Sequence, residues 1–184
     1  MVTPALKGHL VEISRFREIL GRPLVNGDVE RDWRALEMRS GVILPEDYKQ
    51  FVTAYGPGCV NDQLYVFHPR AAGGDEGLRL ESLWDQASYA YSDLARNAPE
   101  MYPYPVHPAP GGCVPIARST SGNHVLLAPP EIDGGGWSVV LDMGQWIQLR
   151  MSFTDFLWKA LQGELDIPVI EGEPTFEPVG VVEE

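Results

Sequence analysis

The sequence predicts an α+β fold, a mostly antiparallel sheet flanked by N-terminal, middle and C-terminal helices. The first observation is the order of the patterns, since helical periodicity occurs before residue 55, over residues 83–96 and again after residue 152. The second is that the strand patterns of residues 114–149 follow one another through short polar turns, as in a meander. A chain of 184 residues fits one domain with a sizeable core.

Two helices are predicted in the first 40 residues. Apolar residues at helical spacing indicate a first helix over residues 8–20. Asp28 is a suitable N-cap for a second helix, in which Trp33 and Leu36 share one face. We predict that Trp33 anchors this helix in the core and does not serve as a ligand platform.

A third helix and a strand follow. Pro45 suits the first turn of a helix, and the two acidic residues after it lie where the helix dipole favours anions. The apolar spacing predicts a helix over residues 45–55, which Gly56-Pro57-Gly58 ends. The β-branched and aromatic run after this break predicts a strand over about residues 60–67.

Residues 33–67 also carry a recurring pattern: a Trp-x-x-x-Glu helix, a Gly-x-x-Leu-Pro-x-x-Tyr helix start, a Tyr-Gly-x-Gly break and a strand ending in an aromatic residue. This pattern resembles the SMI1/KNR4 family of the SUKH superfamily, and the resemblance covers roughly residues 28–163. It implies the same α+β fold and places the chain among the bacterial members. The positions that carry the pattern are Trp33, Glu37, Gly41, Leu44, Pro45, Tyr48, Tyr55, Gly56, Gly58 and Phe67.

The chain is accordingly divided into three parts. Residues 1–27 form an N-terminal helix and linker, residues 28–163 form the SMI1/KNR4-like domain, and residues 164–184 form an acidic, proline-containing tail. We expect the tail to be extended, with residues such as Phe176 able to pack on the body.

The middle of the chain predicts one long helix between two irregular segments. Residues 78–80 can pair briefly as a strand, and a capping-box-like sequence, Ser82 to Asp85, precedes an apolar helical face over about 83–96. Residues 98–112 contain five prolines, which predicts an extended surface loop.

Two hairpins and a last helix complete the prediction. The hairpins are expected over residues 114–128 and 137–149, each around a polar, glycine-containing turn. Pro115 implies that its strand lies at an edge or begins irregularly. A box-like start at Ser152 and an apolar stripe predict a helix to Leu161.

Charge is the strongest compositional signal. The net charge is −12, and residues 160–184 hold seven acids and no Lys or Arg. Because nucleic-acid affinity depends on Lys and Arg neutralising phosphates, this balance argues against a nucleic-acid partner. It is compatible with a basic protein partner, or with acidity that only aids solubility.

The sequence also bears on location and on redox state. No apolar run approaches the roughly 20 residues of a membrane span, so we expect no membrane association. The N-terminus lacks the apolar core of a secretory signal, which predicts a cytoplasmic location. Cys59 and Cys113 do not make a disulfide framework and are expected to be reduced.

Catalytic motifs are missing from the sequence. It contains no Walker loop, Gly-x-Gly-x-x-Gly, Gly-x-Ser-x-Gly or His-Glu-x-x-His, and no two of its four histidines have metal-ligand spacing. The remaining possibility is a nucleophilic pair of Cys59 or Cys113 with a histidine. We therefore predict a protein without catalysis, metal or cofactor.

Two functional hypotheses follow. The resemblance implies an immunity protein, since bacterial family members commonly neutralise the toxin domain, often a nuclease, of a polymorphic toxin. An acidic protein can cover the basic surface of a nuclease by charge complementarity. The alternative is a small-ligand-binding protein or enzyme whose pocket is framed by loops 68–77, 99–112 and 129–136 and lined by aromatic residues (Tyr102, Tyr104 and Trp137), or a regulatory scaffold of the kind implied by the yeast members.

For the immunity hypothesis, we predict an acidic partner-binding ledge on the body of the protein. A tail would have to be ordered on binding, which disfavours its acids despite their number. The predicted ledge consists of four acids and one aromatic anchor: Asp62, Asp75, Glu76, Trp84 and Asp85. Trp84 can serve as the anchor only if it is exposed.

Overall fold

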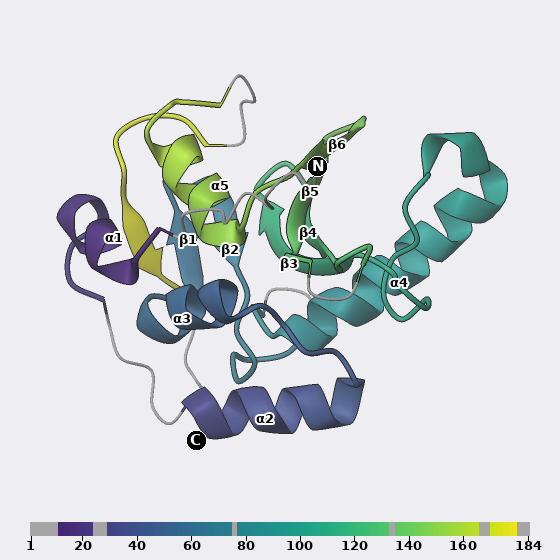
Figure 1. The fold of residues 1–184 in the computed structure, drawn as a ribbon, viewed down its shortest axis with the longest axis horizontal. Coiled ribbons are helices and arrows are strands. Elements are labelled where there is room, and N and C mark those ends of the chain that lie inside the picture. The colour runs from purple at the N-terminus through teal and green to yellow at the C-terminus, as the bar shows by residue number, and fades with distance from the viewer. Residues whose placement is uncertain (1–10, 24–28, 75–76, 133–134, 166–169, 180–184) are drawn as a thin grey trace, which may run out of the picture.

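The computed structural model describes residues 11–23, 29–74, 77–132, 135–165 and 170–179. These residues form five α-helices and a short 3-10 helix, η1, around one sheet (Figure 1). The helices are α1 (Ile13–Leu20), α2 (Val29–Ser40), α3 (Glu46–Ala54), α4 (Leu80–Asn97), η1 (Pro99–Met101) and α5 (Phe153–Leu161).

The sheet has seven strands in the order β6-β5-β4-β3-β2-β1-β7, and every neighbouring pair is antiparallel. Sequential strands are neighbours from β1 to β6, so the sheet is a meander to which β7 adds at one edge. The predicted α+β class with an antiparallel sheet is confirmed. The strands are β1 (Gly58–Val60), β2 (Leu64–Val66), β3 (Val114–Ser119), β4 (His124–Ala128), β5 (Ser138–Asp142), β6 (Trp146–Leu149) and β7 (Phe176–Pro178).

Both faces of the sheet are covered, and the alternation of side chains along β4 shows how. Val125 and Leu127 join the main core with residues of α3 and α5, whereas Leu126 and Ala128 join a second cluster with Ala87 and Tyr91 of α4. The fold therefore has three layers, with α3 and α5 on one face of the sheet and α4 on the other.

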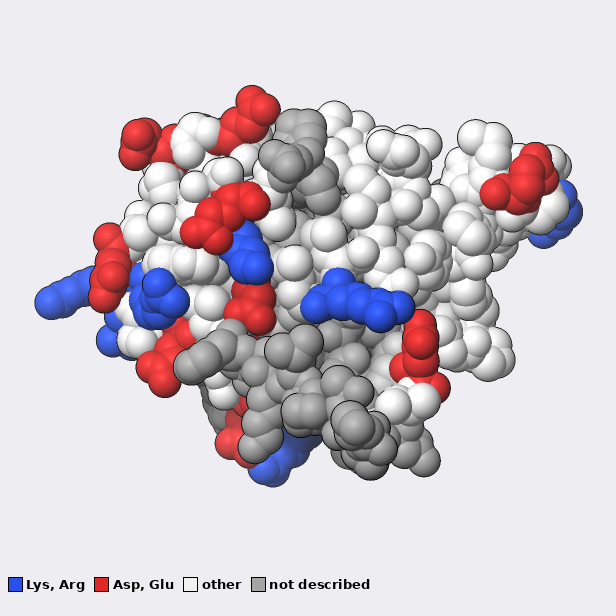
Figure 2. Space-filling view, turned by 45° about the horizontal axis from the view of Figure 1, so that its top comes forward, with Lys and Arg blue, Asp and Glu red and all other residues white. Residues whose placement is uncertain are grey.

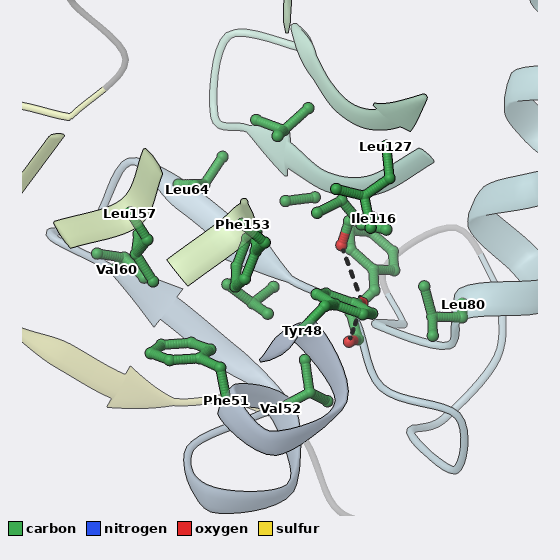
Figure 3. Packing of buried hydrophobic residues seen from close by; sticks show 14 of the residues in the cluster. Tyr48, Phe51, Val52, Val60, Leu64, Leu80, Ile116, Leu127, Phe153 and Leu157 are labelled. Atoms are coloured by element: carbon green, nitrogen blue, oxygen red, sulfur yellow. Dashed lines mark hydrogen bonds between the residues drawn. The ribbon is translucent and has the colours of Figure 1, made fainter. Parts of the chain in front are cut away.

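Helix α3 is the centre of the main core (Figure 3). Tyr48 is fully buried, contacts the ring of Phe153 edge-on and donates a hydrogen bond to the Phe67 carbonyl at 3.1 Å. Asp47, also buried, accepts from the backbone N–H of Thr154 at 2.9 Å and so caps the first turn of α5. Trp33 is 4% exposed and packs against Tyr48, which confirms the predicted core position.

The strand predicted over residues 60–67 is two strands joined by a tight turn. Asn61 and Asp62 have φ angles of 50° and 55°, and the Gln63 N–H donates to the Val60 carbonyl at 2.9 Å. Positive φ at both central positions defines a type I′ turn, whose twist matches that of the flanking strands.

Three further boundaries differ from the prediction. Helix α4 begins at Leu80, so Ser82 and Asp85 lie inside it and cap nothing. β3 lies between β2 and β4, so its strand is not at an edge of the sheet. The register between β3 and β4 shifts between Pro115 and Ala117, so the strand begins irregularly, which is the other alternative that Pro115 implied. The proline-rich segment after α4 contains the short helix η1.

The C-terminal segment adds strand β7 beside β1, an element that the sequence did not predict. Phe176 packs against Phe51 and Tyr55 of the main core. A Cβ atom at Gly58 would lie 2.4 Å from the Phe176 ring and 2.6 Å from the Glu177 carbonyl, so only glycine lets the two strands approach this closely. No helix among the described residues is long and apolar enough to cross a membrane.

Candidate functional site

The two described acids of the predicted ledge lie on different elements. Asp62 is exposed in the β1–β2 turn, whereas Asp85 is exposed on α4, which packs against β3. Figure 1 shows β1 and β2 left of centre and α4 extending to the right. Asp75 and Glu76 lie outside the described residues.

Trp84 does not meet the condition set for an aromatic anchor. It is 5% exposed, its Nε1 donates to the Pro115 carbonyl at 2.8 Å, and its ring contacts His107 at a centroid distance of 5.0 Å. The reason is helical periodicity, because Trp84 shares the buried face of α4 with Leu83 and Ala87. Trp84 is a core residue.

The opposite face of α4 is exposed and begins with Asp85. We call it the α4 outer face. It includes Tyr89, of which 83% is exposed, and Asp93, which pairs with Arg96 at 3.6 Å. Its residues border an open hollow of about 420 Å³ and are Asp85, Ser88, Tyr89, Ser92, Asp93 and Arg96.

A second surface forms where the C-terminal segment meets the β1–β2 turn. The side chain of Asn61, itself buried, donates to the Glu171 carbonyl at 3.1 Å and accepts from the Thr175 N–H at 2.7 Å. Gln63 accepts from the Glu171 N–H at 2.8 Å and donates to its carbonyl at 3.0 Å. The amide side chains of Asn61 and Gln63 thus hold the backbone of residues 171–175 against the β1–β2 turn.

This arrangement gathers exposed carboxylates at one end of the sheet, in what we call the acidic turn: Asp62, Glu171, Glu173 and Glu177. The pKa of the Cys59 thiol is raised to about 11, chiefly by burial and further by the charges of Asp62 and Glu177. In Figure 2, Asp and Glu side chains lie at the upper left, and lower on the left they alternate with Lys and Arg side chains. The hydrogen bonds from Asn61 and Gln63 have no signal in the sequence, so the anchoring of these tail acids cannot be predicted from it.

A polar cluster lies between α4 and the sheet. The Tyr91 hydroxyl donates to Asp142 Oδ2 at 2.6 Å and lies 3.0 Å from His124 Nδ1. Burial raises the pKa of Tyr91 and lowers that of His124, so at neutral pH the phenol keeps its proton and the imidazole is uncharged. The cluster therefore holds α4 to β4 and β5 and does not supply a nucleophile.

The thiols are equally unsuited to nucleophilic chemistry. Cys59 and Cys113 are buried, and burial raises the pKa of each to about 11. The thiolate, which is the nucleophile, is therefore a small fraction at neutral pH. Within the described ranges, no group of three or more His, Cys, Asp or Glu could hold a metal ion.

The aromatic residues of the predicted loop pocket are engaged in packing. Tyr102 and Tyr104 contact the ring of Trp146 at centroid distances of 6.2 and 5.4 Å, and Trp137 packs against the main core. A hollow of about 210 Å³ lies instead at the β3–β4 turn. Several of its polar groups are paired with each other, since Ser119 and Ser121 Oγ lie 2.9 Å apart and Ser121 accepts from Asn123.

One buried titratable group went unnoticed in the sequence. His68 is fully buried, its Nδ1 accepts from the Arg70 N–H at 3.0 Å, and its Nε2 has no hydrogen-bond partner among the described residues. Burial lowers its pKa to about 4, while the nearby Asp32 opposes the shift and Arg70 adds to it. Asp32 in turn pairs with Arg70 at 3.0 Å, which joins α2 to this segment.

These features define the class of protein: a three-layer α+β domain with exposed acidic residues on a helix face and on a clamped turn, among other places. The chain belongs to the SMI1/KNR4 family (SUKH-1). The sequence model of this family matches residues 30–159, which are more than half of the chain. No curated protein matches the chain. The matched residues include all of α4 and exclude α1 and β7.

Proposed function

We propose that the protein is a non-catalytic protein-binding module, an immunity protein that neutralises a nuclease-type toxin domain through acidic surface complementarity. Membership of the SMI1/KNR4 family is the observation that carries this proposal. The net charge of −12 supports it, because the surface of a nuclease that attracts phosphate is basic.

The form of the surface charge also supports this function. The acids of the acidic turn are attached to a backbone that Asn61 and Gln63 hold at 2.7–3.1 Å, and those of the α4 outer face are on a helix packed against the sheet. Charges on such rigid supports lose little entropy when a partner binds. They also steer a basic partner toward the complex over a distance of about 10 Å at 0.1 M salt.

The test is to co-express the protein with the toxin domain encoded in a neighbouring reading frame of its genome. We expect the protein to restore growth and the purified pair to form a stable complex. Its association rate should fall steeply between 50 and roughly 500 mM salt, as expected for electrostatic steering. A complex that forms equally fast at both salt concentrations would contradict the charge mechanism, and failure to bind or to rescue would contradict the immunity role.

A further inference from the structure

The α4 outer face is a single continuous helical surface. Each of its six residues, from Asp85 to Arg96, lies three or four positions from at least one other, and residues so spaced are neighbours on an α-helix. They border the open hollow of about 420 Å³. Figure 1 shows the distal half of α4 extending beyond the sheet to the right. Tyr89, Ser92, Asp93 and Arg96 of this half are exposed.

The orientation of this face is fixed by the opposite side of the helix. Trp84 is tied to the Pro115 carbonyl at 2.8 Å, and Tyr91 is tied to Asp142 at 2.6 Å. Both belong to the buried face of α4, so rotation of the helix would break these hydrogen bonds and expose apolar area. Tyr89 is therefore held outward by the packing of its neighbours.

The chemistry of the α4 outer face suits an arginine side chain. Ser88 and Ser92 are small, which leaves the exposed ring of Tyr89 open to contact. Asp85 lies one turn before Tyr89 and makes no ion pair with any described residue. A guanidinium group can stack on an aromatic ring and donate to a carboxylate at the same time, whereas an ammonium group cannot stack in this way.

The acidic turn lacks such an anchor. Six large apolar or aromatic side chains are exposed among the described residues, and none of them belongs to the acidic turn. Three of the six are carried by α4 or η1, namely Tyr89, Leu94 and Met101. Since aromatic residues supply much of the affinity of protein interfaces, and charges mainly the association rate, the two surfaces differ in what they can contribute.

We infer that the α4 outer face is the docking surface for a basic protein partner, with Tyr89 stacking on a partner arginine and Asp85 pairing with its guanidinium group. This inference rests on the proposed function, of which it names the contact surface. The acidic turn then attracts the partner at long range and lies outside the centre of the interface.

The first test uses a hexa-arginine peptide as probe and the full-length, isotope-labelled protein. In a titration followed by NMR, we expect the shifted amide signals to cluster on residues 85–96. Tyr89→Ala should weaken peptide binding by about 2- to 5-fold, the range of an exposed cation–π contact. A hexa-lysine peptide should show a smaller effect of the same substitution, because stacking favours arginine.

A matched control separates local contact from net charge. Asp85→Lys and Glu171→Lys change the net charge equally, and both side chains are exposed. We expect Asp85→Lys to weaken peptide binding more than Glu171→Lys does. The assignment would be overturned if the two substitutions weakened peptide binding equally. It would also be overturned if the shifted amide signals centred on the β1–β2 turn, or if Tyr89→Ala bound the peptide as tightly as the wild type.

The second test separates this inference from the proposed function. The neighbouring toxin domain is titrated with the wild-type protein, Tyr89→Ala and Asp85→Lys. If the toxin is bound and both variants bind like the wild type, the α4 assignment is wrong and the immunity role stands. If the toxin is not bound but the arginine peptide maps to α4 and responds to both variants, the immunity role is wrong and the α4 surface stands.

Discussion

Asn61 shows how much a single side chain contributes to the architecture. Its positive φ angle closes the β1–β2 turn, and its amide group bonds to Glu171 and Thr175, over a hundred residues later in the sequence. Asparagine tolerates the left-handed region better than most residues. The same residue thus forms a hairpin and clamps the C-terminal segment.

The side chains of α4 show where sequence reasoning succeeded and where it failed at the residue scale. Periodicity correctly put Trp84 on an apolar face, which leaves Asp85 on the exposed one. Tyr89 is one turn beyond Asp85 and follows from the same periodicity, so the exposed aromatic residue could have been predicted. The clamp of Glu171 by Asn61 and Gln63 could not, since it depends on contacts distant in the sequence.

The first prediction concerns the effect of replacing Trp33 on the stability of the fold. It is 4% exposed, contacts the Tyr48 ring and donates to Thr53 Oγ1 at 3.1 Å. Trp33→Ala should therefore lower the free energy of unfolding by about 3–5 kcal/mol, as for other large-to-small core substitutions. Urea denaturation measures the change, with Tyr89→Ala as the exposed control, expected within about 0.5 kcal/mol of wild type.

Gly58→Ala tests the close approach of β1 and β7. Because the added methyl group would meet the Phe176 ring at 2.4 Å, we expect a loss of about 1–3 kcal/mol and weaker protection of β7. Hydrogen exchange of the amides in residues 176–179 gives the local readout. Gly136→Ala is the control, since no atom lies within 4 Å of its added methyl group. Unchanged exchange in β7 would show that the strands tolerate the methyl group.

At the scale of elements, the long and strongly periodic segments were predicted well. The two C-terminal hairpins, α3 and α5 have nearly the expected bounds, and the Ser152 side chain caps α5 by accepting from the Asp155 N–H at 3.1 Å. Short elements were not predicted. β1 and β7 have three residues each, too few for a period to show, and β7 forms only because β1 offers it an edge.

The segment between β2 and α4 carries a pH dependence. His68 pairs with this segment through its backbone, since its N–H donates to Leu78 and its carbonyl accepts from Leu80. The pKa of its imidazole is about 4 in the folded protein and about 6.5 in the unfolded chain. As the pH is lowered, the imidazole of the unfolded chain binds a proton before that of the folded protein does. The contribution of His68 to the free energy of unfolding is therefore fully present above pH 6.5 and is lost as the pH falls toward 4.

We expect this single group to lower the free energy of unfolding by about 1–2 kcal/mol between pH 7 and pH 5. Urea denaturation at several pH values measures the slope, and comparison with His68→Leu isolates the contribution of the imidazole. His107 and His124, whose pKa values burial also lowers, contribute in the same direction and are present in both proteins. Identical slopes for the two proteins would mean that His68 titrates normally in the folded state.

At the scale of the whole molecule, the acidic turn and the α4 outer face lie on different parts of the sheet. The β1–β7 edge carries the acidic turn, and the opposite half of the sheet supports α4 and its outer face. The predicted division at residue 163 assigned the last acids to a separate tail. In the described part of that tail, residues 170–179, an extended segment adds β7 to the sheet, and the Val179 N–H is bonded to the Pro57 carbonyl at 3.2 Å.

Deletion of residues 164–184 tests whether this segment is structural or only charged. The deletion removes β7, uncovers the edge of β1 and exposes Phe51 and Tyr55 where Phe176 packs against them. From the burial of one aromatic ring and the clamp hydrogen bonds, we expect a loss of about 2–4 kcal/mol. An uncovered strand edge pairs with other chains, so the truncated protein should also self-associate.

A comparison of nearly equal net charge keeps the segment and reverses three of its seven acids, with Glu171→Lys, Glu173→Lys and Glu177→Lys combined. The three side chains are exposed and the clamp uses backbone atoms of Glu171. The free energy of unfolding of this variant should therefore lie within about 1 kcal/mol of wild type, and its association state should be that of the wild type. Denaturation and sedimentation measure both properties. If the deletion variant is as stable as the charge variant and self-associates no more than it does, β7 contributes nothing to the fold, and residues 1–163 form the domain without it.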